Sequence, residues 1–67
     1  MLAKHLEIFE LRERAMSARA KAADARRLAS RVADAPTARV LQLHAAEFDA
    51  KAAMLERDVE ELGEQLR

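Results

Sequence analysis

Apolar residues recur at seven-residue intervals along most of the chain, in two pairs of series. The first half carries Ile8, Ala15, Ala22, Ala29 and, three positions later, Leu11, Ala18, Ala25, Val32. The second half carries Ala38, Ala45, Ala52, Val59, Leu66 and Leu41, Phe48, Leu55, Leu62. Two such series offset by three residues are typical of the contact line of an α-helical coiled coil. We call these residues the seam, and they predict two long helices packed along it.

The one cluster of helix-breaking residues lies mid-chain, at residues 34–37. Pro36 disfavours the helical conformation at the residue before it, so one helix is expected to end here and another to begin. The N-cap of the second helix is open between Asp34, Ala35 and Thr37. We expect a single hairpin over residues 1–67, with a helix over about 2–33, a turn at 34–37 and a helix over about 37–63 or beyond.

Folding the chain back at this break places residue i beside residue 70 minus i. This one rule pairs seam residues only with seam residues, such as Ala22 with Phe48 and Ala25 with Ala45. Large side chains mostly face alanines, which allows two helices to approach closely. The predicted fold is therefore all-α, an antiparallel two-helix hairpin of the coiled-coil type.

The charges of the two halves are complementary. Residues 11–32 hold seven basic and two acidic groups, whereas residues 47–64 hold seven acidic and two basic groups. The antiparallel register brings Arg12 toward Glu56, Arg19 toward Asp49 and Arg14 toward Asp58. Exposed ion pairs are individually weak, but together they favour this register over slipped ones. Lys21 opposite Lys51 is a like-charge pair that opposes it.

A further set of apolar residues lies outside the seam, and a lone hairpin leaves it exposed. Its members are Leu2, Leu6, Phe9 and Met16 on the first helix and Val40, Leu43, Ala50 and Met54 on the second. Two helices cannot enclose these side chains, so we expect a homo-oligomer, first a dimer of antiparallel hairpins that forms a four-helix bundle. The alternative is scattered surface hydrophobics. The two groups flank opposite sides of the seam, which leaves one of them for a different protein partner.

The two ends of the predicted hairpin carry opposite charge. Arginines gather near the turn and glutamates near the termini: Arg26, Arg27, Arg31, Arg39 against Glu7, Glu10, Glu60, Glu61, Glu64. Antiparallel association of two hairpins sets basic ends against acidic ones and brings Met16 and Met54 near the two-fold axis. A parallel arrangement and a tetramer remain open.

Residues that carry catalytic chemistry are scarce. The chain has no cysteine, no tyrosine, two serines and one glycine, so it offers no thiolate site, nucleophile constellation or glycine-rich phosphate loop. His5 and His44 lie about 30 Å apart along the hairpin, too far to share a metal within one chain. Only an antiparallel dimer brings His5 of one copy near His44 of the other. We expect no enzyme activity, no cofactor and no metal site.

The net charge of the chain indicates whether nucleic acid is an expected partner. The 67 residues carry twelve basic and twelve acidic side chains, which disfavours a nucleic-acid partner. The alternative is a small dimeric nucleic-acid-binding regulator that uses the basic turn end, Arg26, Arg27, Arg31 and Arg39, by analogy with the hairpin-shaped plasmid copy-number regulators of the ROP type. No apolar stretch is long enough to span a membrane, and charges interrupt the N-terminal apolar residues, so a soluble cytoplasmic protein is expected.

The stretch from Arg27 to Glu56 resembles a pattern found in short bacterial proteins of unknown function. The residues that carry it are Leu28, Ala29, Asp34, Arg39, Leu41, Ala45, Phe48 and Ala52. The resemblance implies a helical hairpin and no activity.

Together these features predict a non-enzymatic, self-associating helical hairpin that serves as a protein–protein interaction or structural module, with no biological process indicated. Its expected interface is Leu2, Leu6, Phe9, Met16, Val40, Leu43 and Met54.

Overall fold

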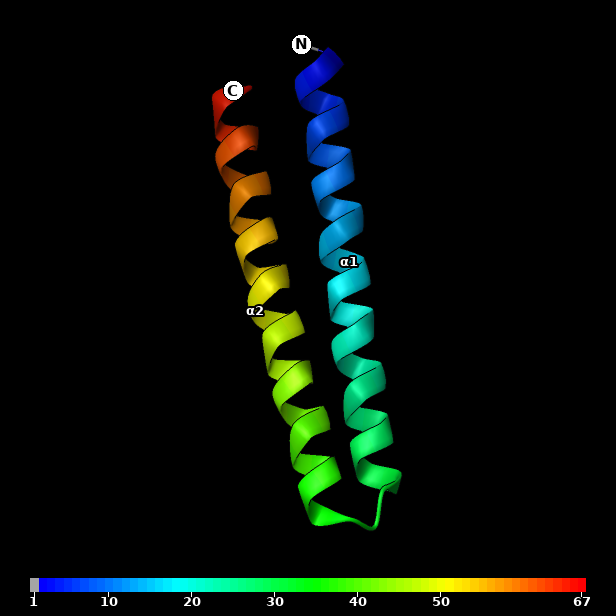
Figure 1. Cartoon of the computed structure of the whole chain (residues 1–67). Helices are drawn as coiled ribbons and strands as arrows, with labels where there is room; N and C mark the ends of the chain where they lie inside the picture. The colour runs from blue at the N-terminus through cyan, green and yellow to red at the C-terminus, as the bar shows by residue number, and fades with distance from the viewer. Residues whose placement is uncertain (1) are drawn as a thin grey trace.

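The computed structural model describes residues 2–67 and shows two antiparallel helices side by side (Figure 1). Helix α1 spans Leu2–Arg31 and helix α2 spans Ala35–Gln65. The described chain forms a rod with principal extents of 51, 14 and 11 Å. The antiparallel two-helix hairpin expected from the seam is confirmed. The four-helix bundle stays a prediction.

The connection between the helices lies at residues 32–34, two residues earlier than the predicted turn at 34–37. Asp34 is the N-cap of α2, and its Oδ2 accepts hydrogen bonds from the backbone N–H of Thr37 at 2.9 Å and from the Thr37 hydroxyl. These hydrogen bonds lower the pKa of the Asp34 carboxyl. Ala35 is helical although it precedes Pro36, because this cap outweighs the local preference. Pro36 itself sits in the first turn, where its missing N–H leaves no helical bond unmade.

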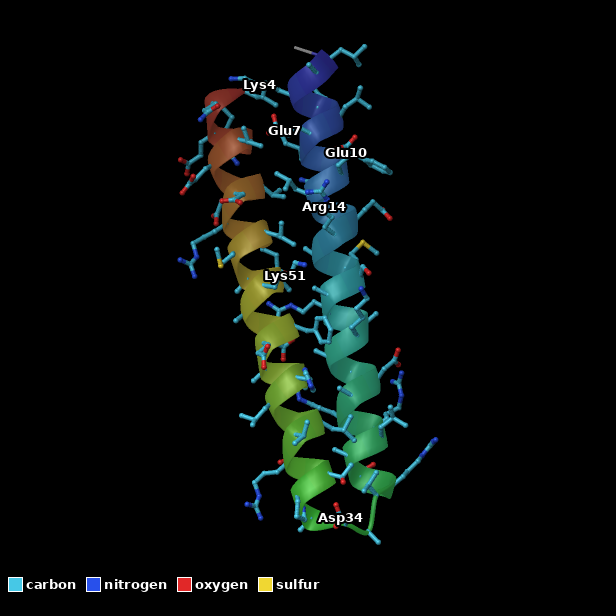
Figure 2. All side chains as sticks on the ribbon, in the orientation of Figure 1. Lys4, Glu7, Glu10, Arg14, Asp34 and Lys51 are labelled. Carbon is cyan, nitrogen blue, oxygen red and sulfur yellow. The ribbon has the colours of Figure 1, made fainter. Side chains whose placement is uncertain are left out.

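Every seam residue is buried or half-buried, as the seven-residue series predict. The buried ones are Ile8, Ala15, Ala18, Ala22, Ala25, Ala29, Ala45 and Ala52. Ala22, Ala25 and Ala45 form one cluster, against which Phe48 packs. At the other end of the hairpin, the Lys4 Nζ donates a hydrogen bond to the Gln65 Oε1 at 3.1 Å (Figure 2). The two helices therefore keep the predicted register over most of their length.

The core of the hairpin is made of small side chains. Seven of the eight buried residues are alanines, and no large side chain of the described chain is completely buried. Apolar burial stabilises a fold by about 25 cal/mol per Å², so alanines contribute little each. A hairpin of this size thus has a small hydrophobic core of its own.

Gly63 lies within the last turns of α2. Its φ is not positive, so its backbone conformation is one that any residue can adopt. A Cβ added there meets no atom within 4 Å. Glycine in a helix loses more backbone entropy on folding than alanine does. We therefore expect Gly63→Ala to raise the free energy of unfolding by about 0.5–1 kcal/mol. Urea unfolding followed by circular dichroism measures this free energy. Ala46→Gly, at an exposed site on the same helix, should lower the free energy of unfolding instead.

Candidate interaction surfaces

The positions beside the seam give the hairpin two long faces. One, here the ladder face, carries Arg12, Arg19 and Arg26 of α1 and Asp49 and Glu56 of α2. The other, here the lysine face, carries Arg14 and Lys21 of α1 and Lys51 and Asp58 of α2. The first group follows seam residues by one position and the second precedes them by one, so the two groups flank opposite sides of the seam. Figure 2 labels Arg14 and Lys51 on the lysine face, with Glu7 further toward the free ends.

Ion pairs connect the helices along the ladder face. The Arg19 Nη1 lies 3.0 Å from the Asp49 Oδ1, and its Nη2 lies 2.7 Å from the Glu56 Oε1. Arg19 Nε also donates to the Glu56 Oε2 at 3.3 Å, and Arg26 pairs with the other Asp49 oxygen. The predicted pairing of Arg19 with Asp49 is confirmed. Four charges thus form one continuous row between α1 and α2.

Two of the predicted pairings do not form ion pairs, although Arg12 and Glu56 line the same hollow. Among residues 2–67 no ion pair joins Arg12 to Glu56 or Arg14 to Asp58. Glu56 is bound by Arg19 instead, because a guanidinium has five N–H donors and can serve two carboxylates at once. The rule that pairs residue i with residue 70 minus i assigns one partner to each residue, so it does not predict that one arginine binds two carboxylates.

The ladder shifts the ionisation of its carboxylates. Hydrogen bonds from Arg26 and Arg19 lower the pKa of Asp49, and the hydrogen bonds from Arg19 lower the pKa of Glu56. The same contacts raise the pKa of Arg19. A carboxylate with a lowered folded pKa stabilises the fold above its unfolded pKa, about 4, and this contribution is lost as pH falls through the folded pKa.

We therefore expect the melting temperature of the wild type to fall as pH is lowered from about 5 to about 2. Asp49→Asn should have a lower melting temperature than the wild type at pH 7. Its melting temperature should also fall less over the same pH range. Thermal unfolding followed by circular dichroism at low salt measures both. Asp58→Asn, on the lysine face, is the control and should keep the wild-type pH profile. An unchanged profile in Asp49→Asn would show that the ladder does not contribute to stability in solution.

Large apolar side chains lie on the outside of the hairpin. All seven residues of the predicted interface are more than half exposed: Leu2, Leu6, Phe9, Met16, Val40, Leu43 and Met54. Leu28, 52% exposed, joins them and was missed by sequence reasoning. The signal for it was present, because Leu28 occupies the flank position that Arg14 and Lys21 fill in the preceding repeats.

These side chains form two stripes on opposite sides of the molecule. The α1 stripe is Leu2, Leu6, Phe9 and Met16, and the α2 stripe is Val40, Leu43 and Met54. Met16 precedes Arg19 by three residues and lines a hollow of about 320 Å³ on the ladder face with Arg12, Ala15, Glu56 and Val59. Met54 follows Lys51 by three residues and so belongs to the side of the lysine face. One flat partner surface cannot cover both stripes at once.

The basic turn end is partly neutralised. Arg26 pairs with Asp49, and Arg27 pairs with Asp24 on its own helix. Of the four arginines proposed for nucleic acid, only Arg31 and Arg39 stay outside the ion pairs of residues 2–67. Arginines engaged with carboxylates release fewer phosphate counterions on binding, so this surface is a weaker candidate than the sequence indicated.

Two other kinds of site do not occur in the described chain. Among residues 2–67 no three histidine, cysteine or acidic side chains gather closely enough to hold a metal ion. Neither described helix contains a stretch both long and apolar enough to cross a membrane. The candidate surfaces are thus the two apolar stripes and the charged faces beside them.

The chain matches no family model, no curated protein and no solved structure. The resemblance to short bacterial proteins rests on the residue pattern alone and assigns no family. The exposed surfaces of the hairpin are therefore the features that bear on its function.

Proposed function

We propose that this hairpin is a non-enzymatic module that associates with a second copy of itself, as a structural element or a protein–protein interaction device. The observation that supports this is where its apolar side chains lie. The buried residues are small, whereas eight large apolar side chains are 52–76% exposed. Burying the α1 stripe against a second hairpin adds apolar area that a chain of this length needs for a stable fold.

The dimensions of the rod suit a second copy. A face about 51 Å long and 14 Å wide offers roughly 700 Å², close to the roughly 800 Å² per partner of a stable protein complex. Charge favours the antiparallel arrangement, because it sets Arg39 near the turn of one copy against Glu60 near the free ends of the other. Such a pair of hairpins is a four-helix bundle.

The α1 stripe on the ladder face is the better first interface. Asp49 and Glu56 already neutralise Arg19 there, so a second copy does not bury this arginine unpaired. The neighbouring α2 positions, Ala46 and Ala53, are small and admit large side chains from a partner. The lysine face instead presents unpaired cations that a two-fold axis would bring together. The α2 stripe then stays outside, available to join dimers into a tetramer or to bind a different protein.

Sedimentation equilibrium tests the proposal, with helicity followed by circular dichroism over the same concentration range. A dimer whose helicity falls on dilution supports it, because assembly then completes the core. A helical monomer at every concentration would overturn self-association. Both stripes would in that case be free for a heterologous protein.

A further inference from the structure

The lysine face contains a hollow of about 130 Å³ between the two helices, lined by Arg14, Ser17, Ala18, Lys21, Phe48 and Lys51. Three of these side chains are cationic, two from α1 and one from α2, and none is a carboxylate. Arg14 and Lys51 are both visible on this side of the hairpin (Figure 2). The three cationic side chains can only donate hydrogen bonds, and the Ser17 hydroxyl can donate one as well. A concave site of this composition suits an anion.

The cations of this hollow have no carboxylate in direct contact within the described chain. None of the ion pairs among residues 2–67 includes Arg14, Lys21 or Lys51. The Lys21 Nζ lies 5.7 Å from the centre of the Phe48 ring, a cation–π contact that offsets little of a full charge. Lys21 and Lys51 also occupy facing flank positions, where like charges destabilise the paired helices. On the ladder face, by contrast, the arginines Arg19 and Arg26 have carboxylate partners.

We propose that this hollow binds a phosphoryl dianion. The planar guanidinium of Arg14 can donate two parallel N–H bonds to phosphoryl oxygens, and the two ammonium groups supply the remaining charge. The Ser17 hydroxyl adds a neutral donor, and the Phe48 ring forms an apolar wall. Because the ligands come from both helices, a bound dianion connects α1 to α2 and relieves the repulsion between Lys21 and Lys51.

The site is independent of the proposed dimer. The hollow lies on the lysine face, whereas the α1 stripe lies with the ladder face on the other side of the seam. A second copy bound to the α1 stripe leaves the hollow open. Small phosphate esters present such a dianion, and the backbone of nucleic acids presents the same phosphoryl oxygens as singly charged diesters; the test below separates the two sources.

Isothermal titration of the full chain with inorganic pyrophosphate, in chloride buffer at constant ionic strength, measures the binding. We expect saturable binding and a higher melting temperature in pyrophosphate than in chloride. Lys51→Gln and Lys21→Gln should weaken binding by about tenfold or more, since each removes a charge-assisted hydrogen bond. Either substitution also removes like-charge repulsion, so these variants fold in chloride at least as well as the wild type. Arg57→Gln, an exposed cation of α2 outside the hollow, is the matched control and should bind as the wild type does.

Equal binding by wild type, Lys51→Gln and Arg57→Gln, or no saturable binding by the wild type, overturns the proposal. A short single-stranded RNA is the second probe. If it binds the wild type, loses affinity in Lys51→Gln and is displaced by pyrophosphate, the phosphate source is a nucleic acid; if only pyrophosphate binds, it is a small phosphate compound. If Lys51→Gln instead lowers the molar mass of the protein and leaves pyrophosphate binding unchanged, a second copy supplies the counter-charge and the phosphate site is wrong.

Discussion

Replacement of Ala22 by leucine is expected to lower the free energy of unfolding by about 1–3 kcal/mol, because the seam has no room for a larger side chain there. Ala22 is completely buried in the cluster with Ala25 and Ala45, and Phe48 packs against that cluster. The register places Ala22 opposite Phe48, so a leucine must displace the ring or separate the helices. Urea unfolding at one fixed protein concentration, followed by circular dichroism, measures the change.

Ala20→Leu is the matched control for this prediction. Ala20 lies two positions away on the exposed side of α1, and leucine and alanine have similar helix propensities. We expect a change near zero in Ala20→Leu. If Ala22→Leu is as stable as this control, the close approach of the helices at Phe48 does not exist in solution and the register is wrong.

The second large effect is on assembly. Phe9→Glu is expected to raise the dissociation constant of the proposed dimer by about 100-fold or more, because aromatic residues buried in an interface carry much of the binding free energy. Phe9 is 60% exposed in the single hairpin, so the hairpin itself does not need the ring. A glutamate there would bury an unpaired charge in the dimer. Sedimentation equilibrium measures the shift from dimer to monomer.

Met54→Glu makes a similar change on the α2 stripe, which lies on the opposite side of the molecule and is 63% exposed at this residue. The proposed dimer should survive it. If Phe9→Glu has the molar mass of the wild type, the α1 stripe is not part of the interface. If only Met54→Glu dissociates the dimer, the interface lies on the side of the lysine face.

Parts of the candidate surfaces were predictable and parts were not. The α1 and α2 stripes follow from helical spacing alone, because a residue outside the seam of a two-helix hairpin has no other element to cover it. Leu28 was also within reach, since it stands where the repeat places charged residues. The hollow on the lysine face was visible only as an unfavourable pairing of Lys21 with Lys51. Its concavity and the presence of Arg14 and Ser17 in the same wall required the packed helices.

The sequence by itself determined the two helices, their antiparallel register and the identity of the buried residues. A seven-residue repeat interrupted by one break brings the residues from Ile8 to Leu66 into one seam, and a register slipped by a repeat leaves apolar side chains unpaired at the helix ends. Only the tertiary structure decided that α2 begins at Ala35, that Arg19 binds both Asp49 and Glu56, and that three cations gather around Phe48. These features depend on how far long side chains reach between two helices at close distance, and the repeat leaves that choice open.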